Sequence, residues 1–313
     1  MGFARRRALA RRRDGRIPRR KRRYARRREW PTLGARGKAV ALLGLLLAAA
    51  VAAVLLFVVF RKPNTHGARV VHFTIASPLV HSTMTETAVI PAGSSGAGRP
   101  LLVFLYGKGE NENSNLDEAM FEALAKLGAR APDIVFPDGG EDSYWHNRQD
   151  GDWGSYVMKE VVPQAIALLH ANPRRVAIGG ISMGGFGAFD LAHLHPHRFC
   201  AVGGHSPALW LEGGETPDGA FDNAEDFARN DVIGDAVSSS HPYPGAKLWV
   251  DVGSEDPFRS ADTTFVQVLR AKGAHVQFHV WSGRHEQSYW QRHWGSYLDF
   301  YASALASCHV SQR

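Results

Sequence analysis

A serine between two glycines, at the junction of an apolar run and a helical pattern, restricts the possible folds more than any other segment. The sequence Gly-Ile-Ser-Met-Gly occupies residues 180–184, directly after the apolar run Arg175–Gly179. A helical pattern begins at Gly184 and Gly185. A serine in a sharp strand-to-helix turn adopts a strained backbone conformation, so its neighbours have to be small. The sequence therefore predicts that Ser182 is an exposed nucleophile on such a turn.

Short apolar runs and helical patterns alternate through the rest of residues 69–313. Strands separated by helices of 10–15 residues indicate βαβ units and a mostly parallel sheet. With the turn at Ser182, this alternation predicts an α/β protein with the α/β-hydrolase fold, with helices on both faces of the sheet and a hairpin of the first two strands. The predicted strands are Val70–Ile75, Thr83–Ile90, Leu101–Tyr106, Ile134–Phe136, Val176–Ile178, Ala201–Gly203, Leu248–Val252 and Val276–Val280. The predicted helices are Asn115–Leu127 (capped by Ser114 or Asn115), Tyr156–Ala171, Gly184–Leu194, Thr263–Lys272 and Gln287–Ser307.

Positive charge is concentrated at the N-terminus of the 313-residue chain. Residues 1–38 carry 17 Lys and Arg residues against Asp14 and Glu29, whereas residues 63–313 carry 18 basic and 28 acidic residues. The net charge of +7 therefore hides a mildly acidic body, which gives no electrostatic reason to expect nucleic-acid binding. We expect residues 1–38 to form a disordered cytoplasmic tail.

An uncharged apolar run, AVALLGLLLAAAVAAVLLFVVF, follows this tail at residues 39–60. About 20 apolar residues are enough for a helix to cross the hydrocarbon core of a membrane. No small-residue cleavage pattern follows the run, as it would after a signal peptide. Because arginines that precede a span stay in the cytoplasm, the sequence predicts an uncleaved single-pass signal-anchor and a short linker at residues 61–68. The domain at residues 69–313 is then extracytoplasmic, with secretion after cleavage as the alternative.

The two cysteines, Cys200 and Cys308, provide neither a disulfide framework nor a metal site. We expect no metal and no organic cofactor. An exported domain would allow the two cysteines to pair, but they lie far apart in the sequence. Two separate thiols are therefore the expectation.

An acid that could orient a catalytic histidine lies in the loop after a late predicted strand. In the α/β-hydrolase fold the acid follows the nucleophile in the sequence, and the histidine follows the acid. The strand Lys247–Gly253 is followed by Ser-Glu-Asp-Pro, residues 254–257. Asp256 is the predicted acid and Glu255 is the close alternative, whereas Asp251 is expected to lie within the strand itself.

A histidine stands in the loop between the last predicted strand and the final helix. Of the 15 histidines, His285 alone has this position, and the alternative His293 falls inside the helix. His285 would deprotonate Ser182 and later protonate the leaving group, while Asp256 orients the imidazole ring.

A serine nucleophile also needs two backbone N–H groups that stabilise the developing oxyanion. The N–H of Met183, directly after the nucleophile, is one predicted donor. The other belongs to the loop after an early strand, where Lys108 is the first choice and Gly109 the second. Segment 205–245 has no clear overall pattern and is interpreted either as a lid or as a surface excursion. A short helix is predicted in it around Ala224–Arg229, and Trp210 is the candidate for substrate contact.

Five segments of the sequence resemble the motifs of a known esterase family of α/β-hydrolases. These segments are Gly-Ile-Ser-Met-Gly-Gly-Phe-Gly-Ala, Pro-Asp-Gly-Gly, Asp-Trp-Gly-Ser-Tyr at 152–156, Gly-Ser-Glu-Asp at 253–256 and Gly-Arg-His-Glu at 283–286. The family groups esterase-D-like S-formylglutathione hydrolases, enterochelin esterases, feruloyl esterase domains and mycolyltransferases, and the resemblance covers about residues 95–305.

This resemblance implies an α/β-hydrolase domain without a large cap that acts on esters or thioesters. It assigns the triad to Ser182, Asp256 and His285, and the oxyanion donors to Lys108 and Met183. Two departures stand out. Many members of the family have a histidine where this sequence has Tyr106, and the mycolyltransferases use a glutamate as the acid, which keeps Glu255 open.

Together, these patterns predict a membrane-tethered serine esterase. Its expected substrate is a small-molecule ester or a lipid ester of the cell envelope. One alternative is an acyltransferase of the mycolyltransferase type that uses the same triad. Another is a hydrolase-like binding protein that has lost catalysis. The sequence gives no oligomeric state.

Overall fold

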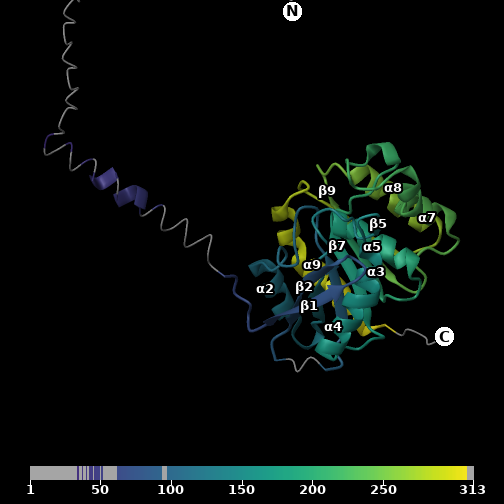
Figure 1. Cartoon of the computed structure of the whole chain (residues 1–313), viewed down its shortest axis with the longest axis horizontal. Helices are drawn as coiled ribbons and strands as arrows, with labels where there is room; N and C mark the ends of the chain where they lie inside the picture. Colours follow the sequence, from purple (N-terminus) through teal and green to yellow (C-terminus); the bar gives the residue numbers. More distant parts are fainter. Residues whose placement is uncertain are drawn as a thin grey trace, which may run out of the picture. The chain divides into compact units, whose positions relative to one another are not determined.

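A computed structural model describes residues 34, 37, 40, 42–44, 46–49, 51, 62–93 and 97–308. The chain divides into two units, residues 1–61 and 62–313, which are considered separately (Figure 1). Most of the predicted tail at residues 1–38 and most of the predicted span at residues 39–60 fall outside the described residues. Within the part of the chain that the structure describes, no helix combines the length and the apolar character that a membrane crossing requires.

An eight-stranded sheet with the order β1-β2-β4-β3-β7-β8-β9-β10 forms the centre of the second unit. The strands β1 and β2 form an antiparallel hairpin, and β2 is antiparallel to β4, while all the other neighbouring pairs are parallel. The predicted mostly parallel sheet is confirmed. The strands are β1 (Arg69–Ser77), β2 (Ser82–Ile90), β3 (Leu101–Leu105), β4 (Asp133–Phe136), β7 (Val176–Ile181), β8 (Ala201–His205), β9 (Lys247–Gly253) and β10 (Val276–Trp281).

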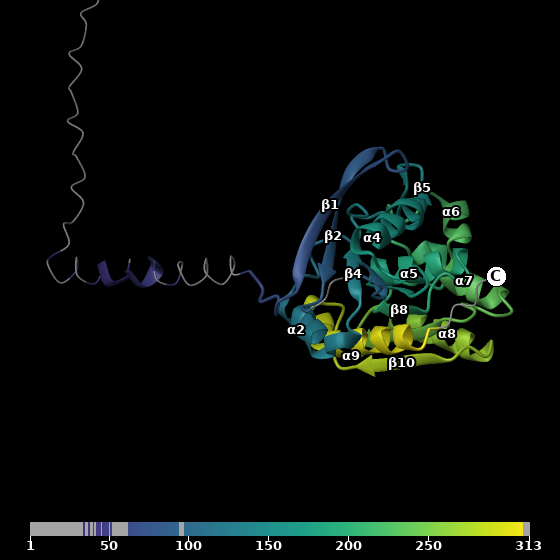
Figure 2. The ribbon, with the colours of Figure 1, turned by 90° about the horizontal axis from the view of Figure 1, so that it is seen from below.

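Helices cover both faces of this sheet (Figure 2). On one face, α2 (Glu118–Leu127) packs beside α9 (Gln287–Ala306). On the other face lie α4 (Val162–Leu169), α5 (Met183–Leu194) and α8 (Arg259–Ala271). Because β3, β7 and β8 are covered on both sides, every one of their residues is buried. This explains why these strands appear in the sequence as continuous apolar or glycine-rich runs.

Several predicted boundaries differ from the observed ones. The helix predicted from Asn115 starts at Glu118, because the carboxylate of Asp117 accepts a hydrogen bond from Met120 N–H at 2.8 Å and caps the helix in place of Ser114 or Asn115. The helix predicted from Tyr156 begins earlier. It runs through α3 (Trp153–Tyr156) and a π-helical segment (Val157–Val161) into α4.

Some short elements were not predicted. A small hairpin is formed by β5 (Asn147–Arg148) and β6 (Gly151–Asp152). Segment 205–245 contains the predicted helix α6 (Ala224–Arg229) and, in addition, α7 (Val232–Ser238), which is capped by Asp231. These elements lack the length that makes a periodic pattern recognisable in a sequence.

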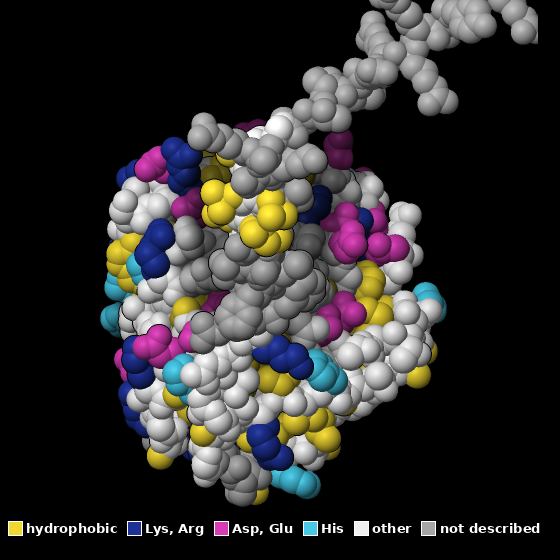
Figure 3. All heavy atoms as spheres, turned by 90° about the vertical axis from the view of Figure 1, so that its left-hand side faces the viewer, with side chains coloured by type: hydrophobic (Ala, Val, Ile, Leu, Met, Phe, Trp, Pro, Cys, Tyr) yellow, Lys and Arg dark blue, Asp and Glu magenta, His cyan; other side chains and the backbone are white. Residues whose placement is uncertain are grey.

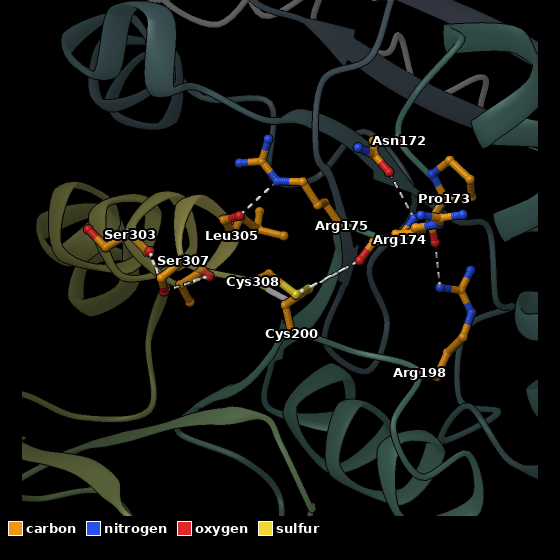
Figure 4. Close-up of a disulfide and its surroundings, with 11 residues drawn as sticks. Asn172, Pro173, Arg174, Arg175, Arg198, Cys200, Ser303, Leu305, Ser307 and Cys308 are labelled. Atoms are coloured by element: carbon orange, nitrogen blue, oxygen red, sulfur yellow. Dashed lines mark hydrogen bonds between the residues drawn. A yellow bond between two sulfur atoms is a disulfide. The ribbon is translucent and has the colours of Figure 1, made fainter. Parts of the chain in front are cut away.

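The expectation of two separate thiols is wrong, because Cys200 and Cys308 form a disulfide (Figure 4). Cys200 lies directly before β8 and Cys308 just after α9, and the fold brings their Cα atoms to 5.6 Å despite a sequence separation of 108 residues. Nearby, Arg175 donates a hydrogen bond from Nε to the carbonyl of Leu305 at 2.8 Å. The end of α9 is thus fixed to the N-terminal ends of the central strands β7 and β8. A bridge of this kind contributes roughly 2–4 kcal/mol to stability.

Charged side chains of both signs are interspersed on the face of the molecule shown in Figure 3. This distribution agrees with the mildly acidic but mixed composition of residues 63–313. On this face the side chains are not gathered by sign into the kind of basic patch that binds a polyanion.

Candidate active site

Ser182 lies at the sharp turn between β7 and α5, as predicted. Its backbone angles are φ 54° and ψ −116°, a strained conformation for a residue with a side chain. A Cβ atom on Gly180 would lie 2.6 Å from the carbonyl oxygen of Leu105, and one on Gly184 would collide with the same oxygen. Both flanking glycines are therefore required by the close approach of β3 to the turn.

The structure places His285 and Asp256 in one hydrogen-bonded line with Ser182. The Nε2 atom of His285 is 2.8 Å from Ser182 Oγ, and its Nδ1 atom is 2.9 Å from Asp256 Oδ2. Since a carboxylate only accepts hydrogen bonds, Nδ1 carries the proton and Nε2 is left to accept the serine hydroxyl. The other oxygen of Asp256 accepts the N–H of Phe258 at 2.9 Å. The two hydrogen bonds together hold the carboxylate in this orientation.

The alternative acid and the alternative base lie elsewhere. Glu255 forms an exposed ion pair with Arg284 at 3.1 Å, and only Asp256 reaches the histidine. His293 lies within α9, where its ring stacks on Trp281 with a centroid separation of 3.9 Å. Of the residues that the sequence left open, Asp256 and His285 are the two that join Ser182.

The loop after β3 distinguishes between the predicted oxyanion donors. Gly109 N–H donates to the carbonyl of Glu141 at 2.7 Å, so it is not free to bind an oxyanion. Gly107 N–H donates to the carboxylate of Glu110 at 2.9 Å. The N–H groups of Lys108 and Met183 have no hydrogen-bond partner within the described residues. Lys108 and Met183 therefore retain the backbone groups that an oxyanion hole needs.

Tyr106, which departs from the motif that the resemblance implies, has a buried hydroxyl that supports the same loop. The hydroxyl accepts the N–H of Gly139 at 2.7 Å and lies 3.1 Å from Asp138 Oδ1 and 2.9 Å from the carbonyl of Gly140. The carbonyl of Tyr106 accepts a hydrogen bond from the indole of Trp145 at 3.2 Å. Tyr106 thus connects the end of β3 to the loop after β4.

The structure buries Trp210 in an aromatic cluster, where it is 7% exposed. Its neighbours are Tyr144, Phe186, Phe221 and Phe258, with ring centroids 5.5 to 6.0 Å away. Phe258 in turn lies 5.1 Å from the ring of His285. Trp210 is therefore separated from the histidine by a single ring, and its contact with substrate stays a prediction.

The sequence did not predict a second histidine–aspartate pair, which lies on the strands β8 and β9 next to Ser182. His205 Nδ1 is 2.7 Å from Asp251 Oδ1, and both side chains are fully buried. The carboxylate of Asp251 also accepts hydrogen bonds from Trp249, Tyr289 and Tyr297 at 2.7 to 2.9 Å. Nε2 of His205 lies 3.0 Å from the hydroxyl of Tyr301. These residues are called the buried hub: His205, Asp251, Trp249, Tyr289, Tyr297 and Tyr301.

The buried hub is joined through the backbone to the line formed by Ser182, His285 and Asp256. The carbonyl of His205 accepts the N–H of Ser182 at 3.1 Å, and Tyr289 lies one turn into the helix that follows His285. Only knowledge that β8 and β9 are neighbours would have revealed this pair, because His205 and Asp251 carry no local signal. Asp251 itself lies inside β9, as expected.

Burial changes the protonation of carboxyl groups near the site. It raises the pKa of Glu86 to about 8. This happens although the carboxyl group of Glu86 accepts a hydrogen bond from Tyr156 O–H and another, of 2.7 Å, from Asp138 N–H. Burial also raises the pKa of Asp262, and the nearby charges of Asp256 and Asp251 add to the effect.

Among the described residues, no group of three or more His, Cys, Asp or Glu side chains is placed to hold a metal ion.

The sequence is similar to curated mycobacterial proteins. It is 28% identical over 149 residues to the MPT51/MPB51 antigen of Mycobacterium tuberculosis, which covers 43% of this chain and 49% of the antigen. It is 25% identical over 240 residues to the diacylglycerol acyltransferase/mycolyltransferase Ag85A of Mycobacterium leprae, which covers 72% of this chain and 65% of that protein. The chain thus spans about half the length of the MPT51-type relatives that it matches.

Solved structures support the assignment of the fold. A ferulic acid esterase superposes with a TM-score of 0.67 at 21% identity, covering 76% of this chain and 98% of that enzyme. At this identity the likeness shows the α/β-hydrolase-like fold alone. A family model described as "Putative esterase" matches residues 77–294, which include the whole Ser182, Asp256 and His285 line. The chain therefore belongs to this esterase family.

Proposed function

We propose that this protein is a serine esterase that forms an acyl-enzyme on Ser182. The observation that carries the proposal is the continuous line from Ser182 Oγ through His285 to Asp256, with hydrogen bonds of 2.8 and 2.9 Å. His285 takes the hydroxyl proton as Ser182 attacks the ester carbonyl, and then gives it to the leaving alcohol. Water then attacks the acyl carbonyl while His285 takes its proton, and the bond to Ser182 Oγ breaks as His285 returns that proton to the serine, which releases the carboxylic acid. Asp256 holds the imidazole in the required tautomer throughout.

The backbone supplies the other half of this chemistry. Negative charge develops on the carbonyl oxygen in the tetrahedral intermediate, and the free N–H groups of Lys108 and Met183 are the donors proposed to stabilise it. Removal of one such donor in related chemistry costs about 100-fold to 1,000-fold in rate. Since these donors are backbone groups, the folded loop supplies them whatever the side chain.

An acyltransferase is the second candidate, and the similarity to Ag85A favours it. That relative is named as a diacylglycerol acyltransferase and mycolyltransferase, and its match extends over 72% of this chain. The two reactions share the acyl-enzyme and differ in whether water or an alcohol receives the acyl group. Turnover that rises on addition of glycerol or trehalose, with a new ester as product, would favour the transferase. Release of free acid only would favour the esterase.

A fluorophosphonate probe tests the proposed nucleophile. The full chain should be labelled, and Ser182→Ala should remove the label while the fold is retained. Labelling of the Ser182→Ala protein at the same rate would exclude Ser182 as the nucleophile. A folded wild-type protein with neither label nor ester turnover would favour the non-catalytic binding protein instead.

The proposed location is the outer side of a membrane, with residues 39–60 as an anchor. The support is the length of this uncharged run and the Cys200–Cys308 disulfide, since disulfides persist in oxidising compartments. A reporter enzyme that is active only outside the cytoplasm should be active when it is fused to the C-terminus of the full chain. Activity of a reporter that works only in the cytoplasm would contradict the orientation.

A further inference from the structure

Glu110 lies beside the nucleophile, yet the proposed reaction does not use it. Its Oε2 atom accepts the N–H of Gly107 at 2.9 Å. A Cβ atom placed on Gly107 would lie 3.4 Å from this oxygen and 3.5 Å from Ser182 Cβ. The carboxylate oxygen and the nucleophilic residue are therefore less than about 7 Å apart.

Glu110 interacts electrostatically with His285, in contrast to Glu112 on the same loop. Burial raises the pKa of Glu110, and the charge of His285 lowers it. Glu112 lies two residues further along the loop. Burial raises the pKa of Glu112, and its charged neighbours are Asp138, which raises the pKa further, and His72, which lowers it. The side chain of Lys108 is exposed, so water and salt screen its charge more strongly.

We propose that Glu110 sets the charge preference of the site, so that the substrates are esters whose groups near the reacting carbonyl are neutral or cationic and not anionic. This inference rests on the proposed function of Ser182. Two unit charges about 6 Å apart, in a medium with an effective dielectric constant between about 20 and 80, change a rate constant by about 3-fold to about 100-fold. A tenfold effect for each unit of charge is the expected magnitude.

Three butyrate esters of the same shape and different charge form the test. Choline, 3,3-dimethylbutanol and 2-sulfoethanol each place a tetrahedral group two carbons from the ester oxygen, and this group is cationic, neutral and anionic, respectively. The value of kcat/KM would be measured for the full chain in non-ionic detergent at low salt and pH 8. We expect the choline ester to exceed the neutral ester about tenfold, and the neutral ester to exceed the sulfoethyl ester by about the same factor.

The variant Glu110→Gln keeps an oxygen for Gly107 N–H and removes only the charge. We expect it to bring all three esters within about threefold of one another. The matched control Glu112→Gln should leave the wild-type ratios within about twofold. An unchanged choline-to-sulfoethyl ratio in Glu110→Gln, or an equal loss of the ratio in Glu112→Gln, would overturn the proposal. So would a folded Glu110→Gln protein that has lost all three activities, because Glu110 would then position the loop.

The labelling of Ser182 separates this inference from the proposed function. If the fluorophosphonate probe labels the wild-type protein at Ser182 and the esters turn over without charge preference, only the role of Glu110 is refuted. If the probe does not label Ser182, the nucleophile itself is refuted, and the charge preference with it.

Discussion

The molecule contains the same sequence of hydrogen bonds twice, once in the candidate active site and once in the buried hub. In each, an aspartate binds Nδ1 of a histidine, at 2.9 Å in Asp256–His285 and 2.7 Å in Asp251–His205. In each, Nε2 faces a hydroxyl, Ser182 Oγ at 2.8 Å and Tyr301 OH at 3.0 Å. The pattern of hydrogen bonds alone therefore does not distinguish a catalytic line from a structural one.

The difference lies in access and in the surroundings of the hydroxyl. The side chain of His285 is 23% exposed, whereas that of His205 is completely buried. Ser182 sits on a strained turn next to free backbone N–H groups, while burial raises the pKa of the Tyr301 hydroxyl and keeps it neutral. Reactivity requires a path for the substrate and a place for the oxyanion, and only the Ser182 line has both.

Removal of the two hydroxyls should separate the two lines most clearly. Ser182→Ala should lower kcat/KM for an ester by about 10⁴-fold to 10⁶-fold with little change in melting temperature. Tyr301→Phe should keep kcat/KM within about threefold and lower the free energy of unfolding by about 1–3 kcal/mol, because His205 loses a partner. Ester kinetics and urea denaturation of both proteins measure these effects. A comparable loss of activity in both variants would contradict the distinction.

The two aspartates offer a matched pair with the same chemical change. Asp256→Asn should lower kcat by about 10⁴-fold through loss of the correct imidazole tautomer, with a small effect on stability. Asp251→Asn replaces a carboxylate that accepts four hydrogen bonds by an amide with one acceptor oxygen, which should destabilise the fold by roughly 3–5 kcal/mol. If Asp251→Asn unfolds with wild-type stability, the hub does not support the fold.

A buried acid without a histidine partner extends the comparison to pH. Both groups that bond to Glu86 are neutral donors, and its pKa is raised to about 8. The folded protein therefore holds the proton more tightly than the unfolded chain, and stability should fall as pH rises from about 4.5 to about 8. Glu86→Gln imitates the protonated acid and should remove the share of this pH dependence that Glu86 contributes, about a few kcal/mol across the range. Melting temperatures across this range test it, and the surface control Glu118→Gln should keep the wild-type slope.

Replacement of Phe258, one of two aromatic rings next to His285 in the described part of the chain, should give the smallest effect. The ring of Phe258 lies 5.1 Å from that of His285, whereas His205 of the buried hub stacks on Tyr297 with a centroid separation of 3.6 Å. Phe258→Ala should lower kcat/KM by about 3-fold to 10-fold, because His285 gains freedom to leave its orientation. Phe227→Ala, in the aromatic cluster next to Phe221 at 5.2 Å, should reduce stability and leave kcat/KM unchanged. Equal kinetic effects of both variants would remove the special role of Phe258.

The sequence predicts those parts that depend on neighbouring residues. The turn at Ser182 is predictable because strain, small neighbours and a strand-to-helix change all fall within ten residues. Asp256 and His285 are predictable from their positions after successive strands, since the ends of parallel strands meet at one edge of the sheet.

The remaining parts depend on contacts between distant segments. Cys200 and Cys308 meet because α9 returns along the sheet to the start of β8, which no spacing in the sequence reveals. His205 and Asp251 pair across β8 and β9, and the choice of Asp256 over Glu255 depends on which side chain faces the histidine. The N–H of Gly109 is occupied by Glu141, a residue 32 positions away.

The convergence of four donors on one carboxylate has a consequence for how this protein can change over generations. Trp249, Tyr289, Tyr297 and His205 come from three different elements, and each depends on Asp251 for its partner. Replacement of Asp251 alone leaves four buried donors without this acceptor. We therefore expect residue 251 to change only together with the residues that donate to it. Among homologues, the identity of residue 251 should therefore covary with that of residues 205, 249, 289 and 297, while the surface loops drift independently.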